Sequence, residues 1–323
     1  MPRRRLGVVL LLPEPVATEV DGLRRACGDT ALGTIAPHIT VVPPVNVRED
    51  DLGAGLAALR SAAASVLAGP FTLTLGPAST FGPASPTLFL DVGGDRPTLQ
   101  RLRDAVFRAP LHRPVDHPFQ PHVTLATEIE RGRLEAAVTA LADYRQAVEI
   151  ERVTLLEQRR DGDGRRSWVA LADAALGPSF VVERGGLRLA VSDTAVPDPE
   201  ARALLAEAGR GCPGRTAAPP DRPIASELAS RRYLVARADA RIVGVLVLAG
   251  LAGDRPSVAG VHVTSEHRRG GIGRLLVERA VDGLRPAQWL EADPAVIPAA
   301  WLAALGWRRG SESPRNGLWM RKR

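Results

Sequence analysis

Short apolar runs alternate with helix-like stretches along the first half of the chain, and the order of these elements repeats. Six runs have the length and pattern of β-strands: Leu6–Leu12, Ile39–Val42, Phe71–Leu75, Leu88–Val92, Val123–Ala126 and Val148–Leu156. Apolar helical stripes that begin at Leu52, Leu99 and Leu134 lie between them. The pattern predicts strand–helix–strand–helix–strand twice, over about residues 6–77 and 86–157. We expect the two copies to pair about a pseudo-twofold axis, with Ser167–Leu171 as an added edge strand.

A second alternating pattern begins after a break rich in glycine. Gly177-Pro178 and Gly185-Gly186 interrupt the first pattern, and Leu187–Val191 opens the next as a strand. We therefore expect an α/β (α+β) chain of two domains, residues 1–175 and 187–323, joined by a linker over 176–186. Residues 211–223 are expected to form an exposed loop, because Gly and Pro are frequent there.

Composition agrees with two folded domains and excludes several classes of protein. Of 323 residues, 45% are hydrophobic and 24% are charged, which is ordinary for globular proteins and unlike disordered ones. Two distant cysteines, Cys27 and Cys212, exclude a disulfide scaffold and a cysteine-based zinc site. The longest apolar run, Ile242–Gly253, is too short to span a bilayer. Arg3–Arg5 and Leu6–Leu12 superficially resemble a signal peptide, but a buried strand explains them better. We expect a cytoplasmic protein with no membrane partner.

The net charge changes this picture little. It is +6, and Lys322 is the one lysine in the sequence, so nearly all the positive charge is arginine. We interpret the excess of arginine over lysine first as a coding bias and only second as a sign of a nucleic-acid-binding surface.

The middle strand of each copy opens with the same pattern. Pro37-His38-Ile39-Thr40 and Pro121-His122-Val123-Thr124 occupy equivalent places in the two copies. Because side chains alternate along a strand, each histidine shares a face with the threonine two residues later. Across a twofold axis, one neutral imidazole can accept a proton while the other donates one, and the hydroxyls can stabilise charge on a phosphate. The pattern predicts phosphodiester chemistry without metal, with catalytic His38, Thr40, His122 and Thr124.

A metal site is the alternative use of the histidines near the second motif. His112, Asp116, His117 and His122 are suitable ligand types. Four prolines interrupt the segment, so neither helical nor strand spacing aligns these side chains, and we expect no metal.

The two motifs resemble the paired His-x-Thr motifs of the two-histidine phosphoesterases, the superfamily of bacterial 2′-5′ RNA ligase and RNA 2′,3′-cyclic phosphodiesterase. The resemblance covers about residues 1–175 and includes Phe119-Gln120 before the second motif. It implies a bilobal fold of duplicated βαβαβ modules and hydrolysis of a 2′,3′-cyclic phosphate or 2′-5′ linkage in RNA or a nucleotide. Many RNA-ligase-type members carry an arginine shortly after the second motif, where this chain has Thr127; Arg113 is a candidate replacement.

A glycine-rich turn follows a strand in the second half. Val258–Val263 leads into Arg268-Arg269-Gly270-Gly271-Ile272-Gly273, and an amphipathic helix follows. Glycines let the backbone approach a ligand, and the free N–H groups of a first helical turn attract an anion. The turn therefore predicts a pyrophosphate site, although its glycine order fits neither a Rossmann loop nor a Walker loop.

Arg268-x-x-Gly271-x-Gly273 resembles the acetyl-CoA loop of the GNAT N-acetyltransferases, and the likeness extends over about residues 184–323. It implies the acyl-CoA N-acyltransferase fold and acetyl-CoA as cofactor. It also implies that β-strand backbone groups hold the pantetheine arm and that the loop holds the pyrophosphate. The cofactor-binding residues expected on this basis are Val261, Val263, Arg268, Arg269, Gly270, Gly271, Ile272, Gly273 and Arg274.

The acetyl-transfer chemistry is less fully specified than the cofactor site. Many GNAT enzymes place a tyrosine in a late helix as general acid, and the matching residue here is Leu302. His262 is either a base or a structural residue of its strand. We expect a bifunctional enzyme that hydrolyses a phosphodiester and acetylates an unidentified amine. The alternatives are an RNA-end-binding module with a catalytically silent, acetyl-CoA-sensing GNAT domain, and two activities that act on one metabolite.

Overall fold

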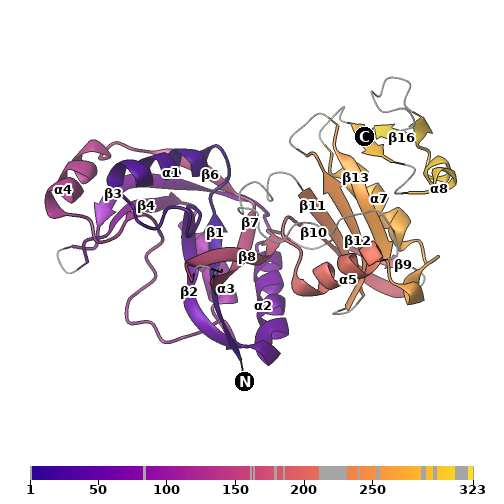
Figure 1. Ribbon diagram of the computed structural model, residues 1–323, viewed down its shortest axis with the longest axis horizontal. Helices are drawn as coiled ribbons and strands as arrows, with labels where there is room; N and C mark the ends of the chain where they lie inside the picture. The colour runs from indigo at the N-terminus through magenta and orange to yellow at the C-terminus, as the bar shows by residue number, and fades with distance from the viewer. Residues whose placement is uncertain are drawn as a thin grey trace. The chain divides into compact units, whose positions relative to one another are not determined.

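The computed structural model describes residues 2–82, 85–160, 162, 164–177, 180–184, 186–210, 231–238, 241–251, 255–284, 289–293, 297–309 and 319–322. The loop expected over 211–223 lies outside them. The chain divides into two compact units, Met1–Pro178 and Ser179–Arg323 (Figure 1). No helix among the described residues combines the length and apolar character needed to cross a membrane.

The first unit contains the predicted repeat. Its first copy consists of β1 (Arg3–Leu11), α1 (Val16–Cys27), β2 (His38–Arg48), the 3₁₀ turn η1 (Glu49–Asp51), α2 (Leu52–Ser65) and β3 (Phe71–Thr80). Its second copy consists of β4 (Leu88–Gly94), α3 (Arg96–Val106), β5 (His122–Ala126), α4 (Arg131–Ala140), β6 (Gln146–Ile150) and β7 (Arg152–Arg160). The added edge strand is β8 (Arg166–Ala175). The run Val148–Leu156, expected as one strand, is divided between β6 and β7, which belong to different sheets.

Two antiparallel sheets of four strands form this unit, in the orders β2-β1-β7-β8 and β5-β4-β3-β6. Equivalent strands hold equivalent places, so β2 and β5 are outer strands beside β1 and β4. The last strand of each copy crosses into the other copy's sheet: β3 pairs with β4, and β7 pairs with β1. Each sheet is therefore completed by the other copy.

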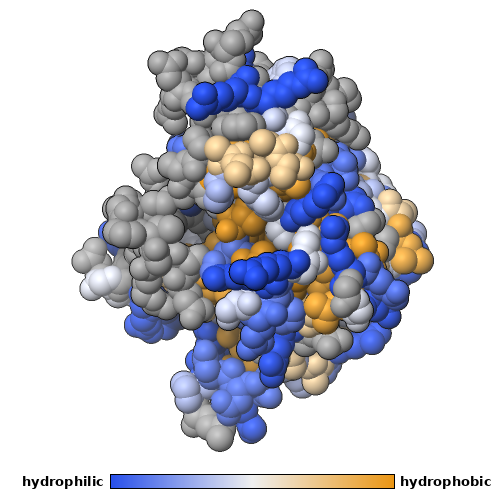
Figure 2. Space-filling view, turned by 90° about the vertical axis from the view of Figure 1, so that its right-hand side faces the viewer, coloured by the Kyte–Doolittle hydropathy of each residue, from blue (hydrophilic) through white to orange (hydrophobic). Residues whose placement is uncertain are grey.

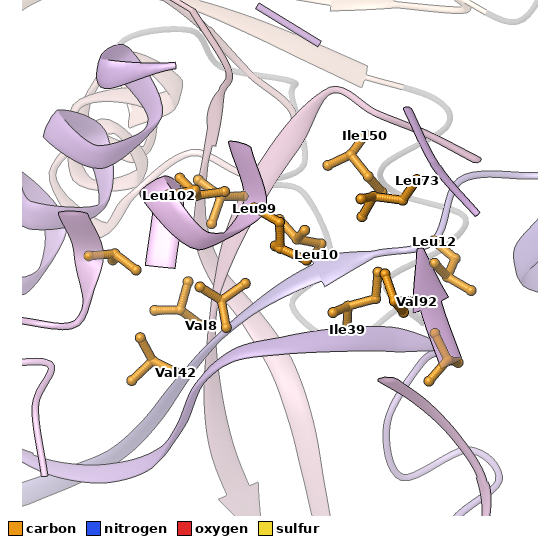
Figure 3. Packing of buried hydrophobic residues seen from close by; sticks show 14 of the residues in the cluster. Val8, Leu10, Leu12, Ile39, Val42, Leu73, Val92, Leu99, Leu102 and Ile150 are labelled. Carbon is orange, nitrogen blue, oxygen red and sulfur yellow. The ribbon is translucent and has the colours of Figure 1, made fainter. Parts of the chain in front are cut away.

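One hydrophobic cluster joins both sheets and their helices. Figure 3 shows part of it, where Leu10 lies near Leu99 of α3 and Ile39 lies beside Val92 of β4. Burying a side chain of this size contributes roughly 1.5–3 kcal/mol. Because the core takes alternate residues of β2 and β5, the residues between them face away from it.

The second unit is built on one sheet of eight strands, in the order β15-β16-β14-β13-β12-β11-β10-β9. Its strands are β9 (Phe180–Arg184), β10 (Leu187–Thr194), β11 (Arg231–Ala238), β12 (Arg241–Ala249), β13 (Ser257–Val263), β14 (Trp289–Ala292), β15 (Arg308–Arg309) and β16 (Trp319–Lys322). The helical elements are α5 (Pro199–Arg210), η2 (Ser265–His267), α7 (Ile272–Asp282) and α8 (Ala299–Ala304). The α5 and α7 helices pack in separate apolar clusters with the sheet. On the face of this unit that Figure 2 presents, hydrophilic side chains lie beside apolar ones.

Strand β9 differs from the sequence expectation. Residues 176–186 were expected to form a linker, but Phe180–Arg184 pairs antiparallel with β10 at the edge of the sheet. Gly186, one of the glycines that indicated a linker, lies in the turn between these two strands and has a φ of 81°. The short run of Phe180, Val181 and Val182 was hidden by its glycine-rich surroundings, and Val182 packs against the apolar cluster.

Candidate functional site

The two His-x-Thr motifs begin two neighbouring strands of the first unit. His38 and Thr40 open β2, and His122 and Thr124 open β5; all four side chains are half-buried. The residues between and after them, Ile39, Val41, Val123 and Leu125, are fully buried. The predicted alternation is therefore present, with the polar side chains on the face turned away from the core. Strands β2 and β5 lie against each other.

Each histidine makes an equivalent hydrogen bond through its Nδ1 atom. The Nδ1 atom of His38 lies 2.8 Å from the carbonyl oxygen of Ala36, and that of His122 lies 2.8 Å from the carbonyl oxygen of Gln120. A carbonyl oxygen only accepts, so Nδ1 must carry the proton in each ring. The Nε2 atom of each imidazole is then the one left for proton transfer.

The strand residues opposite the two histidines differ in chemistry. Leu11 of β1 is in register with His38, whereas Asp91 of β4 is in register with His122. Residues paired in this way share a face, with their Cβ atoms roughly 4.5–5.5 Å apart. His38 therefore has a hydrocarbon neighbour at the position where His122 has a carboxylate.

Burial and charge lower the pKa of His38 to about 4. Desolvation is the largest cause, and electrostatic interaction with Arg24 and with His122 acts in the same direction. The hydrogen bond to Ala36 opposes them but is outweighed. His38 is consequently neutral at pH 7, and the two imidazoles are close enough to interact electrostatically.

Two phenylalanines form an aromatic support for His122. The ring centroid of Phe81 lies 5.0 Å from that of His122 in an edge-to-face arrangement, and the centroid of Phe89 lies 5.2 Å from it. The two phenyl rings stack on each other at 4.3 Å. Phe89 is fully buried, whereas Phe81 is 42% exposed. An aromatic surface is thus open to solvent directly beside His122.

Arg24 of α1 fixes the segment that leads into His38. Its buried guanidinium pairs with Asp29 and Asp21, each at 2.8 Å. It also donates to the carbonyl oxygens of Ile35 at 3.0 Å and Ala31 at 3.3 Å. The approach to the first motif therefore depends on this buried cation.

Arg103 of α3 connects the surroundings of both motifs. Its guanidinium carbon lies 4.2 Å from the ring centroid of Phe107 and 4.6 Å from that of Phe119. The same group donates a hydrogen bond to the carbonyl oxygen of Val41, next to Thr40. Phe119 precedes His122 by three residues. Sequence reasoning missed both buried arginines, although each copy has one near the end of its first helix.

The other candidates named from the sequence stay outside this group. Arg113 and Thr127 are exposed, and no described contact joins Arg113 to His38 or His122. His112, Asp116 and His117 are also exposed. Within the described residues, no three His, Cys, Asp or Glu side chains gather as a metal site would require.

In the second unit, the pairing of β13 with β14 ends before the residues expected to hold the cofactor arm. These parallel strands pair only where Ser257 and Val258 meet Glu291 and Ala292. Val261 and Val263 lie beyond this pairing and are half-buried.

The glycine-rich turn and the first turn of α7 form the adjoining anion site. Gly271 is the N-cap residue, with φ at 77° and no side-chain cap, and Arg269 also has a positive φ of 67°. Arg268 donates from Nε to the carbonyl oxygen of Val263 at 3.2 Å, which fixes the turn to β13. A Cβ atom on Gly273 would lie 3.4 Å from the Trp301 ring. Uncapped N–H groups at a close backbone approach, beside Arg274, suit the pyrophosphate of acyl-CoA.

The residues expected to carry acetyl-transfer chemistry are placed less favourably. Leu302 is fully buried in the apolar cluster of this unit, where it packs rather than reacts. His262 is half-buried in β13, in register with Val245 of β12. The described part of α8 therefore supplies no general acid at the position of Leu302.

Comparison with known proteins agrees with this division into two units, each of which has its own candidate site. Residues 12–162 match the 2′-5′ RNA ligase superfamily, and residues 193–304 match the acetyltransferase (GNAT) family. The chain thus carries a 2′-5′ RNA ligase-type two-histidine domain followed by a GNAT domain, as the sequence resemblances predicted.

Curated bacterial proteins resemble the first domain alone. The protein named "Putative phosphoesterase OB1230" from Oceanobacillus iheyensis is 26% identical over 185 residues, covering 54% of this chain and 98% of its own. A protein of similar name from Halalkalibacterium halodurans is 27% identical over 173 residues, covering 53% of this chain and 96% of its own.

Solved structures resemble each part of the chain. Escherichia coli LigT, crystallised with 3′-AMP, is 19% identical, with a TM-score of 0.41, over 54% of this chain and 99% of LigT. E. coli YhhK bound to coenzyme A is 17% identical, with a TM-score of 0.32, over 42% of this chain and 98% of YhhK.

Proposed function

We propose that the first unit hydrolyses phosphodiesters without a metal ion and that its substrate is a 2′,3′-cyclic phosphate on a nucleotide or an RNA end. The observation that carries this proposal is the matched pair of Nδ1 hydrogen bonds, from His38 to Ala36 and from His122 to Gln120. They commit both rings to the same tautomer and leave two Nε2 atoms for one proton acceptor and one proton donor.

The surroundings of the two histidines assign their roles. His38 faces Leu11 and lies near the charge of Arg24, which favours the neutral ring that a base requires. We assign the other role, that of proton donor, to His122, which faces the carboxylate of Asp91. His38 is therefore the general base and His122 the general acid.

The reaction then proceeds by in-line attack of water on phosphorus. His38 Nε2 takes a proton from water as the new P–O bond forms. The P–O bond to one ribose oxygen breaks, and His122 Nε2 gives that oxygen its proton. Thr40 and Thr124 donate hydrogen bonds to the non-bridging oxygens as negative charge grows on them. The product is a phosphate monoester, and the two histidines exchange protonation states until solvent resets them.

Phe81 supports a nucleotide over an aliphatic phosphodiester as the substrate. Its half-exposed ring, stacked on Phe89 and next to His122, offers a flat apolar surface within reach of a group attached to the phosphate. A nucleobase stacks on such a surface.

Hydrolysis of 2′,3′-cyclic nucleotides and cyclic-phosphate-ended oligoribonucleotides in EDTA tests the proposal. We expect turnover by the wild type and a loss of at least about a hundredfold in His38→Ala and in His122→Ala. Abolition by EDTA, or full activity in either variant, would contradict the two-histidine mechanism. An inactive wild type that still binds RNA ends would favour a binding role instead.

For the second unit, we propose acetyl transfer from acetyl-CoA to an amine. Val261, Val263 and the turn from Arg268 to Arg274 would hold the cofactor, and the thioester would supply the activated acetyl group. Since Leu302 is buried and apolar, the described part of α8 offers no proton donor at this position, and solvent would supply the proton to the CoA sulfur. Release of free CoA in the presence of an amine panel tests this. CoA binding without release would favour a sensing role.

A further inference from the structure

A guanidinium group lies against the glycine that begins α7. Arg184 is the last residue of β9, and it pairs in register with Leu187 across the hairpin. A Cβ atom built on Gly271 would lie 2.5 Å from Arg184 Nε and 2.9 Å from its Cζ and Nη2 atoms. The planar group therefore packs directly on the Cα atom of Gly271, at the centre of the anion site described above.

This position is electrostatically unusual for a cation. The N-terminus of a helix carries a positive partial charge of about half an elementary charge, so a nearby guanidinium is repelled by it. Arg268, Arg269 and Arg274 belong to the same turn and raise the local positive charge further. Arg274 pairs with Glu278 at 2.7 Å, but in the described part of the unit no carboxylate pairs with Arg184 or Arg269. The repulsion is relieved when an anion with more than one charge binds between these groups.

We propose that Arg184 is a ligand of the CoA pyrophosphate, which it holds together with the N–H groups at the start of α7. The proposal rests on the CoA binding proposed above and adds a residue that lies outside the segment matching the GNAT family, 193–304. A guanidinium suits this role because its planar fork can donate two hydrogen bonds to one phosphate. Gly271 is then required twice, for its positive φ and for the space that Arg184 occupies.

Equilibrium binding to the full-length protein tests the role of Arg184. The probes are CoA, 3′-dephospho-CoA and pantetheine, measured by calorimetry against the wild type, Arg184→Met and Arg188→Met. Arg188 is the matched control, because it is an exposed arginine on the facing strand of the same hairpin. Methionine keeps most of the apolar stem, and thermal unfolding of each variant reports whether the hairpin remains folded.

We expect Arg184→Met to weaken CoA and 3′-dephospho-CoA equally, by about tenfold to a hundredfold, as for a charge-assisted hydrogen bond. Pantetheine binding should not change, and Arg188→Met should bind all three like the wild type. Loss for CoA but not for 3′-dephospho-CoA would overturn the pyrophosphate assignment in favour of the 3′-phosphate. Equal affinity of Arg184→Met and the wild type would overturn the proposal altogether.

Two further results distinguish failure of the Arg184 proposal from failure of the proposed CoA binding. A wild type that binds none of the three probes would reject the proposed acetyl-CoA site itself. If Arg184→Met unfolds, Arg184→Lys replaces it. We expect Lys to lose part of the affinity, because it keeps the charge but not the planar fork. Full affinity in Arg184→Lys would show that charge alone is recognised and would overturn the two-bond contact.

Discussion

Arg24 and Arg103 are equivalent residues of the two copies in the first unit. Each is buried, and each precedes the last residue of its copy's first helix by three positions. Their partners differ: Arg24 pairs with Asp29 and loop carbonyls, whereas Arg103 lies between two phenyl rings and donates to Val41. Both copies therefore have a buried arginine at this position, but carboxylate and carbonyl groups surround it in the first copy and aromatic rings cover it in the second.

Replacing Arg103 should lower the stability of the first unit. Arg103→Met leaves the Val41 carbonyl oxygen without this donor, and we expect the free energy of unfolding to fall by about 1–3 kcal/mol. Urea unfolding measures the loss. Arg101→Met, an exposed arginine of the same helix, is the control and should change stability by less than about 0.5 kcal/mol. Equal stability of the Arg103 variant and the wild type would show that the bond to Val41 is not used in solution.

Acid should destabilise the first unit through His38. Its folded pKa, about 4, lies below the ordinary value of 6.5, so protons bind the unfolded chain more readily between these two values. The stabilising effect of the neutral ring is complete above pH 6.5 and is lost as pH falls towards 4. Urea unfolding at pH 7 and pH 5 should show a smaller loss of stability in His38→Gln than in the wild type. Identical losses would mean that His38 titrates normally.

The pH dependence of catalysis should show the same lowering of the His38 pKa. Because His38 stays neutral well below pH 6.5, the acidic limb of the pH–rate profile for kcat/KM should lie near pH 4. A limb near 6.5 would assign the base to another group.

Asp91 should be a positioning residue for His122. Asp91→Asn removes the carboxylate that lies in register with His122, and we expect kcat to fall up to about tenfold while KM changes little. Asp104→Asn, which neutralises an exposed carboxylate of α3, controls for net charge and should leave both constants unchanged. A rise in KM with an unchanged kcat would contradict a role in positioning His122.

Phe81 should affect binding more than chemistry. Stacking of a base on an aromatic ring contributes about 1–3 kcal/mol, so Phe81→Leu should raise KM for a nucleoside 2′,3′-cyclic phosphate about fivefold or more with little change in kcat. Ribose 2′,3′-cyclic phosphate, which lacks the base, is the matched substrate and should be affected no more than twofold. Equal losses on both substrates would contradict base stacking.

The repeat and its motifs could be predicted because both depend on local patterns. Alternation of apolar residues around His38 and His122 sets which side chains are buried, and this is visible in a few residues of sequence. Glycines around Gly271 likewise indicate a turn before a helix.

The remaining features depend on contacts between distant residues. The residues around Leu75 do not indicate that β3 pairs with β4 of the second copy, because strand pairing depends on how all the elements pack in the core. Arg103 interrupts an apolar stripe, and only its aromatic neighbours show why it is buried. Likewise, β9 follows a glycine-rich break, so Arg184 could not be placed near Gly271 from sequence alone.

The exchange of the last strands between the two copies determines when the first unit can complete its fold. β1 pairs with β7 across about 150 residues, so neither sheet is complete until nearly the whole unit has left the ribosome. Pairings between such distant segments slow folding, because a long loop must close before any contact compensates for it. A chain that stops after β5 contains both histidine motifs but lacks the central β7 strand of the first sheet. Fragments that end before β7 should therefore lack a complete first sheet, and on the proposed function they should not hydrolyse a phosphodiester.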